Sequence, residues 1–193
     1  MPRRGILPSM PTLVAMLRGI NLGSRRVKMD LLQELCVNAR FECVKTYLQS
    51  GNAVFRTKSQ NIADVKATLE RAMEKEFAFH SEVIIRNIAE LRAVVAANPF
   101  GKEAKSVPGK VVVTFLGEAV SAANRKASRA MEIAPEQMRM NSRELYFYFP
   151  SGQARTKLSW PKVEKLVGPA FTSRNWNTVT GLLDLALTID ADA

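Results

Sequence analysis

The sequence predicts an α+β fold: two tandem ferredoxin-like subdomains (split βαβ, alpha-beta plait) with a C-terminal helix. Three observations lead to this class. Apolar periodicity over residues 12–87 gives the order strand, helix, strand, strand, helix, strand, which is that of the split-βαβ motif. A segment rich in lysine, glycine, proline and serine at residues 101–109 then interrupts the pattern. Beyond it, strand, helix, two strands and helix recur, so the second half is expected to end in a helix in place of a fourth strand.

The chain has room for one large domain or two small ones, since it has 193 residues and 47% of them are hydrophobic. Three prolines and two arginines in residues 1–11 predict a disordered N-terminal extension. The expected boundaries are then residues 12–100 for the first subdomain and residues 101–193 for the second, with its C-terminal helices. We find no matching residues between the halves, so the repeat is one of architecture alone.

The elements of the first half follow from local patterns. Residues 12–18 alternate enough to form a strand, and residues 19–28 form a loop with two glycines. Leu32, Leu35 and Cys36 then share one helical face, and Asn61 can cap the second helix. The other predicted elements are strands at residues 43–49, 52–56 and 82–86, and helices that run to about residue 79 and over residues 88–97.

The strands at residues 43–49 and 52–56 are expected to form a hairpin about Ser50 and Gly51. Glycine and asparagine tolerate the positive φ that tight hairpin turns require. The turn Gln49-Ser-Gly-Asn52 carries more hydrogen-bonding groups than a turn needs. We therefore expect it to meet other polar clusters, in particular those around Arg18 and Arg174.

The second half begins with a β-branched strand at residues 110–116 and a polar helix at residues 119–131. Pro161 lies in the first turn of a further helix, where proline is tolerated. The face of the last helix is made by Val179, Leu182 and Ile189. The remaining predicted elements are strands at residues 137–141 and 144–149 and the helix at residues 159–167.

The charge balance points to an anionic partner. There are 28 lysines and arginines against 18 acidic residues, a net charge of +10 and a pI near 9.9. Arg25, Arg26 and Lys28 lie in the loop at residues 19–28, with Arg18 at its edge. Possible partners are a phosphate-bearing small molecule or nucleic acid, and the oligomeric state stays open.

Cysteine usage and hydropathy set the expected compartment. The chain has two cysteines, Cys36 and Cys43, which do not form a disulfide framework, so a reducing cytoplasm is expected. The longest apolar run, Leu13 to Leu17, is far shorter than the ~20 residues that span a bilayer. We expect no membrane partner and no cofactor.

The candidate site is rich in hydrogen-bond donors and poor in carboxylates. Arginine offers a bidentate fork to phosphate or carboxylate, and amide side chains can orient the rest of a ligand. A helix start near Asn175 would add free backbone N–H groups. The same residue types also cap helices and close turns, so a purely structural role stays open. The candidate ligand-binding residues are Arg18, Asn21, Gln49, Ser50, Asn52, Lys157, Arg174, Asn175 and Asn177.

Sequence templates for catalysis mostly fail. His80 is the only histidine and lies at a helix end, and no His/Cys spacing predicts a metal site. Ser50 has no general base near it in sequence. Tyr146 and Tyr148 share one face of a strand and could stack bases, although packing under a helix is the commoner use of such a pair. Catalytic residues are therefore unknown.

Five sequence blocks, spread over about residues 12–187, closely resemble those of an uncharacterised bacterial family, domain of unknown function sixteen-ninety-seven. The resemblance implies a two-part α+β plait architecture and no established activity. Where the family often shows glycine and serine, this chain has Ala154 and Thr156. The blocks are Leu17-Arg-Gly-Ile-Asn-Leu-Gly23, Tyr47-Leu-Gln-Ser-Gly-Asn52, Asn98-Pro-Phe100, Lys157-Leu-Ser159 and Thr172-Ser-Arg-Asn-Trp-Asn-Thr178. The residues that match the family pattern are Arg18, Gly19, Asn21, Gln49, Ser50, Gly51, Asn52, Lys157, Arg174, Asn175, Trp176 and Asn177.

Three functional hypotheses follow. The leading one is a binding module for a phosphate-bearing ligand, a nucleotide or nucleic acid, at a donor-rich junction between the subdomains. The first alternative is an enzyme that acts on a small anionic substrate, with Ser50 or a bound water reacting in a pocket of arginine and asparagine. The second is a structural or interaction protein whose motifs only stabilise the junction.

Overall fold

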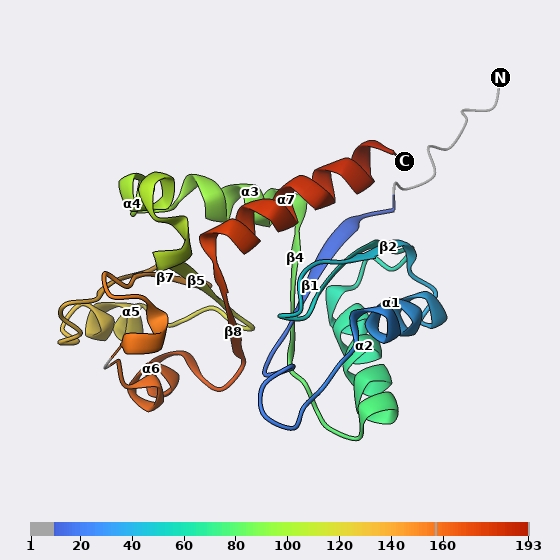
Figure 1. Ribbon diagram of the computed structural model, residues 1–193, viewed down its shortest axis with the longest axis horizontal. Coiled ribbons are helices and arrows are strands. Elements are labelled where there is room, and N and C mark those ends of the chain that lie inside the picture. The colour runs from blue at the N-terminus through green and yellow to red at the C-terminus, as the bar shows by residue number, and fades with distance from the viewer. Residues whose placement is uncertain (1–9, 157, 193) are drawn as a thin grey trace.

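The computed structural model describes residues 10–156 and 158–192. Within them the chain forms two four-stranded antiparallel sheets and seven α-helices (Figure 1). Residues 1–9 of the predicted N-terminal extension and Lys157 of the predicted site lie outside the described residues. Among the described helices, none has the length and hydrophobicity needed to cross a membrane.

The first sheet has the strand order β2-β3-β1-β4, and every neighbouring pair is antiparallel. Two helices cover one of its faces, where Leu13, Phe55 and Leu69 are fully or almost fully buried. Asn61 caps the second of these helices as predicted, because its side chain accepts from the Ala63 N–H. The elements are β1 Thr12–Leu17, α1 Met29–Asn38, β2 Glu42–Thr46, β3 Asn52–Arg56, α2 Ile62–Phe77 and β4 Val83–Asn87.

The second sheet has the corresponding order β6-β7-β5-β8, again with antiparallel neighbours. Two helices cover its outer face, where Phe147, Phe149 and Val163 are buried. The elements are β5 Val111–Leu116, α5 Ala122–Ser128, β6 Gln137–Met140, β7 Glu144–Tyr148, α6 Trp160–Val167 and β8 Phe171–Asn175.

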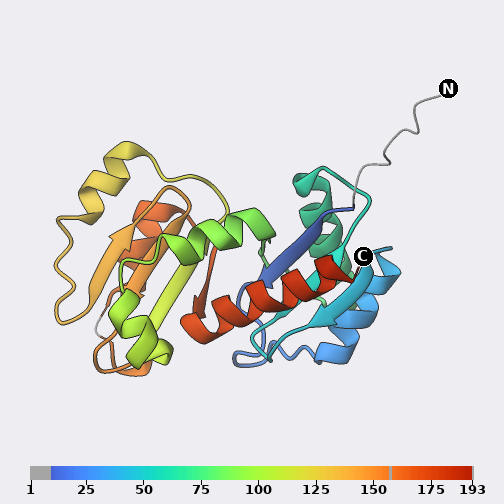
Figure 2. The same cartoon turned by 90° about the horizontal axis from the view of Figure 1, so that it is seen from above.

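A third core lies between the two sheets and holds the halves together. A helix follows the last strand of each sheet, α3 (Ile88–Ala96) after β4 and α7 (Trp176–Ala191) after β8, and the two helices lie side by side across the molecule (Figure 2). Val14 and Ile84 of the first sheet share this core with Val113 and Phe115 of the second and with Leu182 of α7. Because burying one such side chain contributes about 1.5–3 kcal/mol, this shared core strongly favours the packed arrangement.

The strand β8 corrects the sequence interpretation of the second half. Residues 171–175 were expected to lead into the last helix, but they form a fourth strand that pairs with β5. The sequence Phe171-Thr-Ser-Arg-Asn175 lacks the run of apolar residues that marks a buried strand, so local pattern did not reveal it. The second half thus ends in a fourth strand followed by a helix.

Two connections also differ from expectation. The segment predicted as a linker contains the short helix α4 (Gly101–Ser106) and a 3₁₀ turn at Pro108–Lys110. The strand β2 ends at Thr46, so residues 47–51 make a longer turn than the predicted two-residue one. Gly51 has φ +79°, and a side chain there would overlap Ile20, so this turn requires glycine.

Candidate functional site

Arg174, on β8, is buried, with 6% of its surface exposed. Its Nε donates to Asn52 Oδ1 at 2.6 Å, and its Nη2 donates to the carbonyl oxygens of Leu17 at 2.8 Å and Gly51 at 3.0 Å. Its Nη1 donates to two oxygen atoms of β8 itself, each at 2.8 Å. A guanidinium carries five N–H groups, so these five bonds occupy every donor.

The charge on Arg174 is held by neutral acceptors. Burial lowers the pKa of Arg174 to about 10, which leaves it cationic at neutral pH. Among the described residues, its bonds go to carbonyl, amide and hydroxyl oxygens and none goes to a carboxylate. Since the acceptors on β1 and β3 belong to the first sheet, Arg174 fastens the second sheet to the first.

Asn52, at the start of β3, completes this contact from the other side. Its side chain is fully buried, and its Oδ1 accepts from Arg174. Its Nδ2 donates to the Tyr47 carbonyl at 2.7 Å and to Ser50 Oγ at 3.0 Å. The amide therefore fixes the shape of the turn at residues 47–51 and presents an acceptor to the buried arginine.

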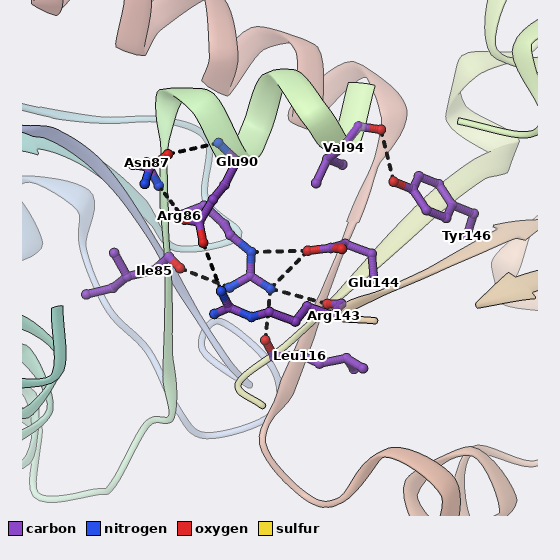
Figure 3. Close-up of polar contacts among 9 residues, drawn as sticks. All are labelled: Ile85, Arg86, Asn87, Glu90, Val94, Leu116, Arg143, Glu144 and Tyr146. Carbon is purple, nitrogen blue, oxygen red and sulfur yellow. Dashed lines mark hydrogen bonds and ion pairs between the residues drawn. The ribbon is translucent and has the colours of Figure 1, made fainter. Parts of the chain in front are cut away.

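A second buried arginine, Arg86 on β4, was not singled out from the sequence. It is 1% exposed, and its Nη2 donates to the carbonyls of Leu116 at 2.9 Å and Arg143 at 3.2 Å (Figure 3). Its Nη2 and Nε also donate to Glu144 Oε1, at 3.1 and 3.2 Å. Burial lowers the pKa of Arg86 and the nearby charge of Arg143 adds to this, while Glu144 acts in the opposite direction. Arg86 thus fastens the first sheet to the second.

The two arginine contacts are reciprocal. Arg86 lies opposite Val14 in the pairing of β1 with β4, and Arg174 lies opposite Val113 in the pairing of β5 with β8. Each donates through Nη2 to the last residue of the other sheet's first strand and to the turn before that sheet's third strand. The matched residues are Leu17 with Leu116, Gly51 with Arg143, Asn52 with Glu144 and Arg86 with Arg174.

An Arg-Asn dipeptide therefore repeats at the same place in both halves, which corrects the expectation that no residues match. Asn87 Oδ1 accepts from the Glu90 N–H at 2.8 Å and caps α3, and Asn175 Oδ1 accepts from the Thr178 N–H at 2.9 Å and caps α7. The Glu90 carboxylate accepts from the Asn87 N–H, and it also accepts from Arg143 at 2.8 Å (Figure 3). The side chain of Asn175, which the sequence predicted to bind a ligand, therefore caps a helix.

Residues 18–28, which we name the basic loop, hold four basic residues and no acidic one. Asn21 fixes its shape: Nδ2 donates to the Val27 carbonyl at 3.0 Å, and Oδ1 accepts from the Val27 N–H at 2.9 Å. The same Nδ2 donates to the Gln49 carbonyl at 2.7 Å, which ties the loop to the turn at residues 47–51. The loop is therefore held in one shape while its cations Arg25, Arg26 and Lys28 are exposed.

Arg18 lies at the start of the basic loop, stacked on an aromatic side chain of the second half. Its guanidinium carbon is 4.3 Å from the centre of the Phe171 ring, and its nearest carboxylate is Glu164 at 4.0 Å. Phe171 in turn stacks on Trp160, with ring centres 6.2 Å apart and planes 16° apart. One third of the Arg18 side chain, 34%, is exposed, so its N–H groups can reach a ligand.

Some of the other predicted residues are exposed, and others are buried in contacts within the protein. Gln49, Ser50 and Asn177 are exposed, and Ser50 Oγ accepts from an amide that offers no base. Tyr146 is 1% exposed and its hydroxyl donates to the Val94 carbonyl at 3.0 Å, so it does not stack bases. The structure therefore brings Ser50, Asn52 and Arg174 together in one set of hydrogen bonds. Asn21 and the Gln49 backbone make a second contact.

A cluster of ionisable side chains lies next to the first residue of the basic loop and consists of Lys66, Glu70, His80 and Glu82. Glu70, His80 and Glu82 place ligand-type atoms within 4.8 Å of one another, the one such metal-ligand group in the described chain. The Lys66 ammonium already lies among them, bonded to Glu82 and 3.5 Å from Glu70. The Arg18 N–H donates to the Glu82 carbonyl at 2.9 Å, so this cluster supports the loop's first residue.

We expect stability to depend on pH through Glu82. Burial by itself would raise the pKa of Glu82, but the hydrogen bond and charge of Lys66 and the contact with His80 lower it below 4.5. A lowered folded-state pKa stabilises the protein above pH 4.5, and this contribution is lost as the pH falls through the folded value. In urea titrations, the stability difference between wild type and Glu82→Gln should narrow below pH 4.5. Glu118→Gln, at an exposed site, is the control, and a constant Glu82→Gln difference would contradict the linkage.

The comparisons with known proteins place the chain beside others of the same architecture. A family model described as "Protein of unknown function (DUF1697)" matches residues 10–146, a range that stops before the last two sequence blocks. The search of curated proteins found no match. Among solved structures, a conserved bacterial protein, SP0830 from Streptococcus pneumoniae, is similar, with 19% identity, a TM-score of 0.70 and coverage of 93% of this chain and 99% of that one. At that identity the likeness shows a shared fold alone.

Proposed function

This chain belongs to the family described as protein of unknown function (DUF1697), whose description names no activity, and from the geometry of the chain we propose a binding module that recognises a phosphate-bearing ligand through the basic loop. In this proposal the molecule is two tandem ferredoxin-like subdomains, residues 12–100 and 101–193. The strand order β4-β1-β3-β2, and its repeat as β8-β5-β7-β6, supports this arrangement. The two free cysteines, Cys36 and Cys43, are compatible with the cytoplasm as the place of action.

The observation that carries the proposal is the pinned basic loop. Arg18, Arg25, Arg26 and Lys28 come within eleven consecutive residues without a carboxylate, from residue 18 to residue 28. The three Asn21 bonds hold the loop before any ligand arrives, so less conformational entropy is lost on binding. The stacked arginine has part of its guanidinium surface facing solvent, where its N–H groups can reach a ligand.

The predicted ligand-binding residues take different parts in this proposal. Arg18 contacts the ligand, with Gln49, Ser50 and Asn177 as further exposed candidates. Asn21 shapes the loop, Asn175 caps α7, and Asn52 and Arg174 hold the two halves in register. The structural hypothesis thus accounts for the members that fix a loop, cap a helix or join the two halves, among which Asn175 is exposed. The binding hypothesis accounts for Arg18 and the further exposed candidates.

We expect the protein to bind a fluorescently labelled single-stranded RNA at low salt, with an affinity that falls steeply as salt is added. The triple variant with Arg25→Ala, Arg26→Ala and Lys28→Ala should bind at least about tenfold more weakly. Its slope of log affinity against log salt should be smaller by about 2, since each phosphate contact with a single strand contributes about 0.7. Fluorescence anisotropy measures both quantities, and competition with free nucleotide tests for a smaller ligand.

The matched control removes three exposed cations elsewhere, with Arg71→Ala, Lys75→Ala and Arg92→Ala, and so changes the net charge equally. It should lose much less affinity than the loop variant. If the two triple variants weaken binding to the same extent, charge alone is responsible and the loop is not a site. If wild type binds neither RNA nor nucleotide at low salt, the proposed function is wrong.

A further inference from the structure

The edge strand β6 presents backbone groups that the fold does not use. Among the described strands, β6 pairs with β7 alone. The Asn141 N–H donates to the Glu144 carbonyl at 2.8 Å, and bonded positions alternate along an antiparallel pair. The N–H and C=O groups of Met138 and Met140 therefore point away from β7. Of these, the Met138 carbonyl accepts from Arg139 at 2.8 Å, and the Met140 groups face outward.

Two neighbouring hollows lie along this strand, and we name them together the β6 groove. The larger has a volume of about 600 Å³ and lies between β6, α5 and the end of α3. The smaller has a volume of about 490 Å³ and lies between β6 and α4. Both are lined by Pro99, Gln137 and Arg139, so the two hollows adjoin at these residues.

The charges of the β6 groove favour an acidic occupant. The cationic residues that line the groove outnumber its two carboxylates, Glu103 and Glu136. Glu136 is 7% exposed and accepts from the Thr156 hydroxyl, so it is turned to the protein. The cationic lining residues are Lys102, Lys105, Arg125, Arg129 and Arg139.

The apolar part of the lining suits side chains of varied shape. Met131, Ile133, Met138 and Met140 line the larger hollow. Methionine is unbranched and polarizable, so a surface rich in it adapts to different partners. A chain lying along β6 in an extended conformation would turn alternate side chains to opposite faces, toward the apolar lining and toward the cations.

We propose that the β6 groove binds an extended acidic segment of a partner protein, which adds to β6 as a further strand of the second sheet. Backbone bonds to the outward groups of Met140 fix the register, as in strand addition at other sheet edges. The cations on the rim select an acidic segment. This inference stands independently of the basic loop, because the two surfaces share no residue.

The test uses a labelled peptide in which glutamate and valine alternate. Wild-type protein should bind it in fluorescence anisotropy, and the same peptide with N-methylated alternate amides should bind at least about tenfold more weakly, because it lacks strand donors. A peptide in which lysine replaces glutamate should show no binding. The triple variant of the basic loop should bind the acidic peptide as wild type does, which separates this proposal from the proposed function.

Two variants examine the groove itself. Met140→Pro removes an outward N–H without touching the bonds to β7, and proline is tolerated on edge strands. Arg129→Glu with Arg139→Glu reverses the rim charge while leaving the backbone intact, so it keeps the test decisive if the proline variant folds poorly. Each should weaken binding of the acidic peptide by about tenfold or more.

Three outcomes would overturn the proposal. The first is that wild type does not bind the acidic peptide. The second is equal binding of the N-methylated and unmodified peptides, which would exclude strand addition. The third is that the charge-reversed variant loses affinity for single-stranded RNA but not for the peptide, which would assign the groove to nucleic acid instead.

Discussion

Arg174→Ala is expected to lower the free energy of unfolding by about 3–5 kcal/mol. The substitution removes every bond of a buried guanidinium and takes the Arg174 donor from the buried Asn52 amide oxygen. The Leu17 carbonyl keeps the Thr172 hydroxyl as a donor, and the Gly51 carbonyl keeps the Leu17 N–H. An unsatisfied buried acceptor costs about 1–3 kcal/mol, and the empty volume left by the arginine side chain adds to this loss. Urea denaturation followed by circular dichroism measures the change.

Replacing Arg174 with lysine tests whether the positive charge or the arrangement of the five donors stabilises the contact. Arg174→Lys keeps the cation but offers three donors from a single nitrogen, which cannot reach acceptors on β1, β3 and β8 together. We expect it to recover only a minor part of the lost stability. Arg92→Ala, at an exposed position on α3, should change stability by less than about 0.5 kcal/mol. If Arg174→Ala stays within that same limit, Arg174 does not hold the halves together.

Most elements were predictable because their apolar residues repeat with a clear period. The strand β3, at residues 52–56, has the predicted bounds, and α2 begins at the predicted cap. The strand β8 was not predictable in this way, since its residues are mostly polar and its pairing partner β5 lies more than fifty residues earlier in the chain. Tertiary pairing decides such a strand, and local sequence does not record it.

The sequence indicated which polar residues belong to the candidate site. It did not indicate which of them are buried in contacts within the protein and which are exposed to a ligand. Sequence shows that Arg174 is an arginine near asparagines, but whether its acceptors are a ligand or backbone carbonyls depends on where Leu17 and Gly51 lie. Arg86 was missed because it ends a predicted apolar strand. The signal that could have found it is the Arg-Asn pair directly before a helix, which occurs at residues 86–87 and again at 174–175.

Arg86→Ala should also lower the free energy of unfolding by about 3–5 kcal/mol, for a different reason. Arg174 leaves neutral acceptors behind, whereas Arg86 leaves Glu144, a carboxylate with 15% of its side chain exposed, without its partner. An uncompensated charge in such a place is more costly than an unsatisfied carbonyl. Chemical denaturation of Arg86→Ala, Glu144→Ala and the double variant gives the coupling energy of the pair.

The double variant distinguishes the two sources of stability at this contact. If the carboxylate left alone is the main cost, Arg86→Ala with Glu144→Ala should be more stable than Arg86→Ala by about 1–3 kcal/mol. The remaining loss then reports the bonds of Arg86 to the carbonyls of Leu116 and Arg143, which correspond to those of Arg174 in the other half. A double variant no more stable than Arg86→Ala would mean that Glu144 needs no partner there. In that case the neutral carbonyl bonds, the part that both halves repeat, would carry the whole contact.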